Sequence, residues 1–203
     1  MRIAVLASGQ GTNLQALLDT VHGHEAQIVA VAGDRPGAPA FGRARGAGIP
    51  TRAFPLGDFA DRAARDAAIA DWLVRQGAEL VVLAGYMAIL TPTFLGRFPD
   101  RIVNVHPSLL PAFPGLRAIE QAVDYGVRVF GVTVHLVVDD GGVDTGPVLL
   151  QGSLELPDAD DPEAVHAALR PLEHELLPEA VRLLARGAVR RDPTRPRRLI
   201  IDR

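Results

Sequence analysis

Four short, continuous apolar runs constrain the fold of this chain more than any other feature. They are RIAVLAS (2–8), QIVAVAG (27–33), ELVVLAG (79–85) and RIVNVH (101–106). Runs without polar alternation are typical of strands that are covered on both faces, as in a parallel sheet. Segments of helical periodicity separate the runs, so strands alternate with helices. The pattern predicts a Rossmann-like α/β fold with a mostly parallel sheet, helices on both faces and ligands at the carboxyl ends of the strands.

The segments between these runs are mostly predicted to be helical. Helices are expected at 13–21, 37–47, 58–76 and 116–125, with a short one at 91–98 and a weak strand at 49–54. Thr12 and Asn13 are both candidates for the N-cap of the first helix, because short polar side chains can accept hydrogen bonds from the free N–H groups there.

The last third of the chain has a different pattern. VRVFGVTVHLVV (127–138) and PVLLQGSLEL (147–156) are expected to pair antiparallel, because the linker is too short for a helical crossover. A long C-terminal helix is predicted at 161–187, with Pro171 and Pro178 expected to kink or reset it. Residues 188–203 hold the only basic cluster and are expected to be exposed and loosely ordered.

Composition narrows the function classes. The chain has 203 residues, 48% of them hydrophobic, which is enough for one substantial core. With no cysteine it can form neither a disulfide nor a thiolate metal site, and a reducing compartment such as the cytoplasm is expected. The formal net charge of −3 argues against nucleic acid as the main partner. The apolar runs are too short for a membrane span.

The first apolar run ends in a glycine loop, ASGQGTNLQ. Glycines allow backbone N–H groups to approach an anion, and the following helix N-terminus adds a partial positive charge. A plain strand–helix turn remains an alternative. So does a dinucleotide site in an NAD(P)-dependent oxidoreductase using loop 8–14, with Asp34 as the ribose acid. Leu14 at the third glycine position counts against the dinucleotide, and the hydroxyls of Ser8 and Thr12 suit a phosphate monoester better.

A second polar cluster follows the fourth run. Asn104 and His106 are two residues apart in the run RIVNVH, so they share one face of the expected strand. An amide and an imidazole there can stabilise an oxyanion, as in acyl transfer. Asp144 lies in the glycine-rich segment VVDDGGVDTGP, and near His106 it would favour the imidazolium. Thr133 and His135 share a strand face that can line the same pocket or pack against it.

Other catalytic sites are disfavoured by their missing motifs. The calcium-loop spacing, the G-x-S-x-G of serine hydrolases and the H-E-x-x-H of zinc enzymes are all absent. No metal site is therefore expected.

The motifs together resemble a known family. SGQGTNLQ, AGYMAIL, NVHPSLLPAFPG, VHLVVDDGGVDTGPVLLQ and a late EH pair are similar to the phosphoribosylglycinamide formyltransferase family, folate-dependent enzymes of purine synthesis. The resemblance runs from Met1 to about Gly187. It implies a single formyltransferase domain at 1–187, with a nucleotide- and phosphate-binding half at 1–100 and a catalytic and folate-binding half at 101–187. It implies 10-formyltetrahydrofolate as the co-substrate and no metal. It also implies that the protein is a monomer or a homodimer.

Residue roles follow from the same resemblance. It implies a catalytic trio of Asn104, His106 and Asp144, and a loop that holds the substrate phosphate at Gly11, Thr12 and Asn13. Glu173 is similar to an acid that contacts the nucleotide. The folate-binding residues that it implies are Arg62, Tyr86, Met87, Ile89, Leu90, Asp140 and Val143.

Three positions depart from the family pattern. Ala88 stands where an arginine is common, Ala112 replaces a frequent lysine, and Gly33-Asp34 replaces a frequent Ser-Asn. None of them touches the trio or the phosphate loop, so they bear on substrate fit more than on the reaction. A formyltetrahydrofolate hydrolase, the oxidoreductase and a non-catalytic binder remain the competing hypotheses.

Overall fold

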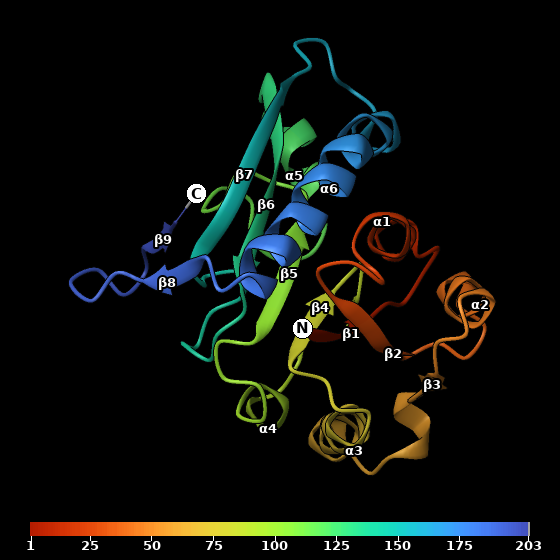
Figure 1. The fold of residues 1–203 in the computed structure, drawn as a ribbon. Coiled ribbons are helices and arrows are strands. Elements are labelled where there is room, and N and C mark those ends of the chain that lie inside the picture. The colour runs from red at the N-terminus through yellow and green to blue at the C-terminus, as the bar shows by residue number, and fades with distance from the viewer. Residues whose placement is uncertain (203) are drawn as a thin grey trace. The chain divides into compact units, whose positions relative to one another are not determined.

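The computed structural model describes residues 1–202. It has two compact units, one of residues 1–104 and one that begins at Val105. Seven strands form a sheet in the order β3-β2-β1-β4-β5-β6-β7 (Figure 1). Four of the recorded strand pairs are parallel and the late pair β6/β7 is antiparallel, which confirms the predicted fold class.

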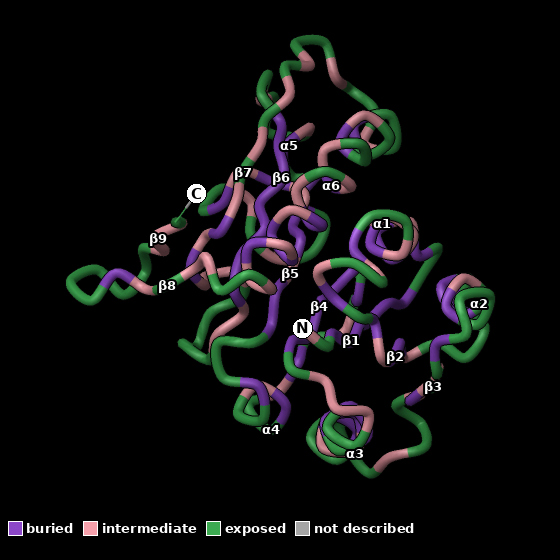
Figure 2. The backbone as a smooth tube through the Cα atoms, viewed as in Figure 1, coloured by how far each residue is buried: buried purple, intermediate pink, exposed green. Residues whose placement is uncertain are grey.

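Every strand expected in the first unit is present. The strands are β1 (Arg2–Leu6), β2 (Gln27–Gly33), β3 (Thr51–Ala53) and β4 (Leu80–Leu83), and β5 (Ile102–His106) runs from the end of this unit into the next. β1, β2 and β4 are almost entirely buried (Figure 2), as their continuous apolar sequences require.

The strand order reverses between β1 and β4, because β1 pairs with β2 on one side and with β4 on the other. In open α/β sheets, ligands bind outside the carboxyl ends of the strands at such a reversal. The loops that follow β1 and β4 are therefore the places where this unit can bind a ligand.

Helices lie on both faces of the strands in the first unit. α1 and α2 contact each other on one face, and α3 and α4 contact each other on the opposite face (Figure 1). The bounds are α1 (Thr12–Thr20), α2 (Pro39–Gly46), α3 (Arg62–Arg75) and α4 (Pro92–Leu95), with a 3₁₀ turn η1 (Leu56–Asp58) before α3.

Two predicted helix starts are wrong. Gly11, not Thr12 or Asn13, is the N-cap of α1; it has a φ of 72°, and no side chain caps the helix. The helix predicted from residue 58 begins at Arg62, because the Asp61 carboxylate accepts a hydrogen bond from Ala64 N and fixes the start there.

The second unit is built on an antiparallel pair. Its elements are α5 (Ala118–Tyr125), β6 (Val129–Leu136), β7 (Val148–Glu155), α6 (Pro162–Ala185), β8 (Val189–Arg191) and β9 (Leu199–Ile201). α6 lies across β6 and β7 (Figure 1). Asp161 is its N-cap, and the helix continues through Pro171 and Pro178, so neither proline ends it.

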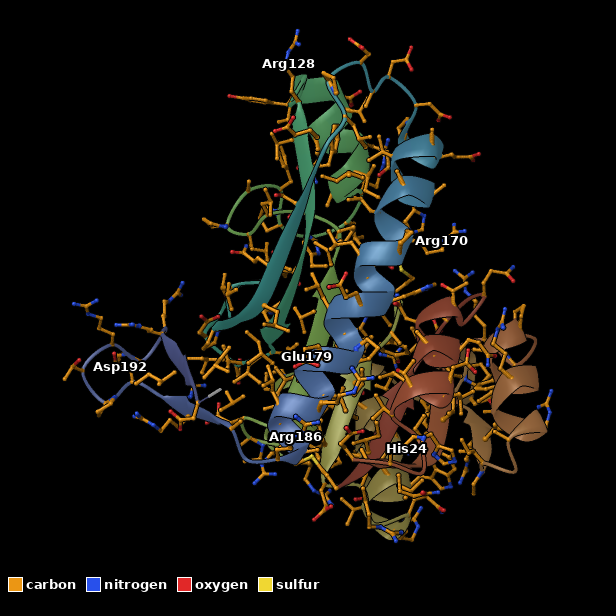
Figure 3. The ribbon with its side chains drawn as sticks, turned by 45° about the horizontal axis from the view of Figure 1, so that its top comes forward. His24, Arg128, Arg170, Glu179, Arg186 and Asp192 are labelled. Carbon is orange, nitrogen blue, oxygen red and sulfur yellow. The ribbon has the colours of Figure 1, made fainter. Side chains whose placement is uncertain are left out.

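The C-terminal segment is more ordered than the sequence suggested. β8 and β9 pair antiparallel between residues 189 and 201, where a loosely ordered tail was expected. Asp192 lies in this hairpin (Figure 3), where its carboxylate accepts hydrogen bonds from Thr194 and Arg195. Arg203, the last residue of the predicted tail, lies outside the described residues. Within residues 1–202, no helix is both long and apolar enough to cross a membrane.

Candidate active site

The first candidate region is the loop between β1 and α1. Ser8 is buried, its N–H donates to Gly85 O at 3.1 Å, and its hydroxyl accepts from Met87 N at 3.1 Å. These two bonds join the loop after β1 to the loop after β4, at the reversal of strand order. Gly11, Thr12 and Asn13 begin α1 at this place, so their N–H groups lie at the positive end of a nine-residue helix.

The segment after β4 presents apolar side chains to solvent. Met87 is 57% exposed and Ile89 is 53% exposed, whereas Tyr86 and Leu90 are buried. Contiguous exposed apolar side chains mark ligand-binding grooves and interaction sites, so this segment is a candidate binding surface. Burial raises the pKa of Tyr86 to about 12, so its hydroxyl keeps its proton at neutral pH. Arg62, the remaining folate-binding residue that the resemblance implies in this unit, is exposed at the first position of α3.

The second candidate region is a cluster of two imidazoles around one carboxylate. His106 Nδ1 is 3.3 Å from Asp144 Oδ2, and His135 Nε2 is 3.4 Å from Asp144 Oδ1. His106 and His135 are buried, and the Asp144 side chain is 12% exposed. Asn104 precedes His106 by two residues on β5, so both side chains leave the same face of that strand.

Each imidazole is also held by a backbone carbonyl. His106 Nε2 is 2.9 Å from Phe113 O, and His135 Nδ1 is 3.0 Å from Leu136 O. A carbonyl oxygen only accepts hydrogen bonds, so these two ring nitrogens donate. Each ring therefore turns its other nitrogen toward Asp144, where the carboxylate can accept a proton or stabilise a positive ring.

Several interactions determine the ionisation of Asp144. Burial alone would raise the pKa of Asp144, but the hydrogen bond with His135, the charge of His106 and the Gly115 N–H together lower it. Gly115 N donates to Asp144 Oδ2 at 2.8 Å. The carboxylate is thus kept ionised at neutral pH, although Asp144 sits at a φ of 56°, where non-glycine residues are uncommon.

A buried hydrogen-bond network supports the loop that follows His106. The Thr133 hydroxyl donates to Ser108 O at 2.7 Å and accepts from Leu110 N at 3.1 Å. Gln151 on β7 donates to Thr133 Oγ1 and to Leu110 O, each at 2.9 Å. Thr133 therefore stabilises the loop that carries Phe113 O. Nothing in the sequence around Gln151 indicates this role.

Three residues implied by the resemblance lie elsewhere in the second unit. Glu173 is buried on α6. Asp140 and Val143 belong to the same loop as Asp144, and Val143 is 47% exposed. Asp140 is held in place by Thr145 Oγ1 and by Arg197 Nη2, the latter at 3.1 Å. Among residues 1–202, no three His, Asp or Glu side chains are grouped as a metal site requires.

Comparison with known proteins identifies the family of the chain. Residues 1–181 match the formyl transferase family. A phosphoribosylglycinamide formyltransferase of Mycobacterium tuberculosis is 45% identical over 189 residues, 93% of this chain and 86% of that protein. Its counterpart in Bacillus subtilis is 38% identical over 185 residues, 90% of this chain and 94% of that protein.

A solved structure shares the fold over nearly the whole chain. Glycinamide ribonucleotide transformylase 1 from Symbiobacterium toebii superposes with a TM-score of 0.93 at 43% identity, covering 99% of this chain and 93% of that one. The names of these relatives favour the formyltransferase hypothesis over the hydrolase and the oxidoreductase.

Proposed function

Because the chain belongs to the formyl transferase family, we propose that it moves the formyl group of 10-formyltetrahydrofolate to the amine of glycinamide ribonucleotide. The products are formylglycinamide ribonucleotide and tetrahydrofolate, in purine biosynthesis. The observation that carries the proposal is the pairing of buried His106 with Asp144, whose Nδ1 and Oδ2 are 3.3 Å apart, with Asn104 two residues before His106 on β5.

The reaction makes one C–N bond and breaks another. The amine attacks the formyl carbon, negative charge develops on the formyl oxygen, and the bond between that carbon and N10 of the folate then breaks. The Asn104 amide and the His106 imidazole donate hydrogen bonds to this oxygen, and removing one such donor typically costs about 3 kcal/mol of transition-state stabilisation. The formyl oxygen replaces Phe113 O as the acceptor of the His106 Nε2 hydrogen.

A proton must move during the same steps. The amine loses a proton as it becomes an amide, and N10 gains one as it leaves. Asp144 is ionised at neutral pH because its neighbours lower its pKa, so it can accept the proton of the amine, directly or through water, and pass it on to the departing N10. His135 holds the second carboxylate oxygen at 3.4 Å and keeps the carboxylate oriented while the proton moves.

Each substrate has its own set of binding residues. Gly11, Thr12 and Asn13 bind the 5′-phosphate, which anchors the nucleotide and orients its amine. Glu173 contacts the nucleotide. Met87 and Ile89 present apolar surface to the pteridine of the folate, and Tyr86, Leu90, Arg62, Asp140 and Val143 complete the folate site. The reaction takes place in the cytoplasm, with the chain as a monomer or a homodimer.

A formyl-transfer assay tests this function. Purified protein is mixed with 10-formyltetrahydrofolate, with and without glycinamide ribonucleotide, and the folate product is followed by absorbance. We expect product only when the nucleotide is present. Product without the nucleotide would indicate a hydrolase, and no product in either mixture would contradict the proposal.

A further inference from the structure

Arg43 on α2 lies directly behind the loop that we propose binds the phosphate. Its Nε donates to Gln10 O at 2.9 Å, and its Nη1 donates to Gln15 Oε1 at 3.0 Å. Both acceptors are neutral, and within residues 1–202 no carboxylate forms an ion pair with this guanidinium. Its positive charge is therefore not neutralised by the protein.

The contact of Arg43 with Gln10 is one of three hydrogen bonds to consecutive carbonyls of the loop. Gly9 O accepts from Ala40 N at 3.2 Å, Gln10 O accepts from Arg43, and Gly11 O accepts from Gln15 N at 2.9 Å. Three consecutive carbonyls of the loop are thus bonded to α2 or to α1. None of the three is left to face an anion.

The orientation of the N–H groups follows from peptide geometry. In a trans peptide the C=O and the next N–H point in opposite directions, and both of these bonds are trans. Because Gly9 O and Gln10 O point to α2, the N–H groups of Gln10 and Gly11 point away from it. No acceptor for either N–H is found in the described part of the chain.

Of the three contacts that hold the loop carbonyls, the one made by Arg43 is the only one that a substitution can remove. A Cβ on Gly11 would lie 2.8 Å from Ala40 Cα, so the backbone of the loop already touches α2. The Gly9 contact is made by a backbone N–H, and the Gly11 contact belongs to the first turn of α1. Only the middle carbonyl depends on a side chain, and it precedes Gly11, whose φ of 72° lies in the left-handed region that glycine adopts without steric cost.

We infer that Arg43 is a positioning residue for recognition of the substrate phosphate. It holds the Gln10–Gly11 peptide with the N–H toward the phosphate and the C=O away from it, and it adds a positive charge behind the loop. Without Arg43 this peptide can rotate and turn its carbonyl toward the anion. This inference rests on the proposed function, which supplies the phosphate-bearing substrate.

The test compares Arg43→Ala and Arg43→Lys with wild type on two amine substrates, glycinamide ribonucleotide and its 5′-dephosphorylated form. For Arg43→Ala we expect KM for the ribonucleotide to rise about tenfold or more, the loss typical of a hydrogen bond to a charged group. The kcat, KM for the folate and activity on the dephosphorylated substrate should stay near wild type. Arg43→Lys keeps the charge but not the forked geometry, so its KM for the ribonucleotide should lie between those of wild type and Arg43→Ala.

Two further measurements separate positioning from general damage. Arg45→Ala is the matched control, because Arg45 is an exposed arginine of the same helix whose side chain forms no hydrogen bond with residues 9–13. The inhibition constant of inorganic phosphate should rise for Arg43→Ala and not for Arg45→Ala. Melting temperatures show whether each variant is folded.

The outcomes distinguish this inference from the proposed function. An Arg43→Ala enzyme that keeps the wild-type preference for the phosphorylated substrate would overturn the role of Arg43. An equal rise of KM for the ribonucleotide in Arg43→Ala and Arg45→Ala would also overturn it. Both results leave the formyl transfer intact, whereas a wild-type protein without transfer activity that also fails to bind phosphate overturns both.

Discussion

Two loops carry the proposed chemistry, and they are held in different ways. The loop of residues 9–13 after β1 is fixed mainly by its own backbone, through hydrogen bonds to neighbouring turns of α1 and α2. The loop of residues 137–147 between β6 and β7 is fixed mainly by side chains, through Asp140, Asp144 and Thr145. One loop is organised to present N–H groups, and the other to place a single carboxylate.

The two loops also use positive φ angles differently. Gly11 supplies one at 72° at no steric cost, since it has no Cβ. Asp144 supplies one at 56° with a side chain attached, and the bonds from Gly115 and the two imidazoles compensate for that conformation. The first loop therefore depends on a missing side chain, and the second on side chains that come from distant parts of the sequence.

The largest effect that this comparison predicts is that of Asp144→Asn. The amide keeps the shape of the side chain but cannot take a proton, so we expect kcat to fall about 100-fold or more. KM for glycinamide ribonucleotide should change little, because the phosphate loop is untouched. Steady-state kinetics with both substrates varied measure the two effects separately.

Asp139→Asn is the control for that variant, because Asp139 is an exposed acid of the same loop that pairs with no residue between 1 and 202. It should behave as wild type. If Asp144→Asn turns over at the wild-type rate, the catalytic assignment of Asp144 is wrong and the loop has a binding role only.

A smaller effect is predicted for Gly11→Ala. The new Cβ would lie 2.8 Å from both Ala40 Cα and Ala40 Cβ, and an alanine at this φ costs about 1–2 kcal/mol. We expect KM for the nucleotide to rise about tenfold, since about 1.4 kcal/mol corresponds to one order of magnitude. The kcat should fall less than KM rises, which is the opposite of the result for Asp144→Asn.

Gly9→Ala makes the same chemical change two residues earlier. Nothing lies within 4 Å of a Cβ built on Gly9, so this variant should be close to wild type in KM and in melting temperature. Equal losses in both variants would mean that the loop tolerates no added methyl group at all, and the special role of Gly11 would be lost.

The contrast between the two loops also explains which features could be predicted from the sequence. Continuous apolar runs predicted β1, β2, β4 and β5, because burial on both faces dictates their composition. The position of the first loop followed from a strand that ends in a glycine-rich segment. These features are local, so a single sequence contains them.

Contacts between distant residues could not be read in this way. Asp144 meets Gly115 across 29 positions of the sequence, and Asp140 meets Arg197 across 57. The sequence predicts a loosely ordered tail around Arg197, because a run of arginines gives no sign of its partner. Likewise, the N-cap of α1 was placed on polar side chains, whereas close packing against Ala40 requires a glycine there.

The smallest predicted effect concerns the contact between Arg197 and Asp140. The Arg197–Asp140 pair is solvent-accessible, with side chains 75% and 31% exposed, and such pairs contribute about 0–1 kcal/mol. Arg197→Ala should therefore lower kcat/KM for the folate by no more than about fivefold. Asp140 keeps its bonds to Thr145 and Gly142, which is why the loop should stay folded.

Arg195→Ala is the matched control, because it removes the same charge from the same hairpin without touching Asp140. A double-mutant cycle with Asp140→Asn then measures the coupling: Arg197→Ala should have almost no further effect in the Asp140→Asn background. If instead the two losses add in full, the hairpin acts on the loop by another route. Additive losses would leave Thr145, Gly115 and the two imidazoles as the contacts that hold Asp140 and Asp144 in place.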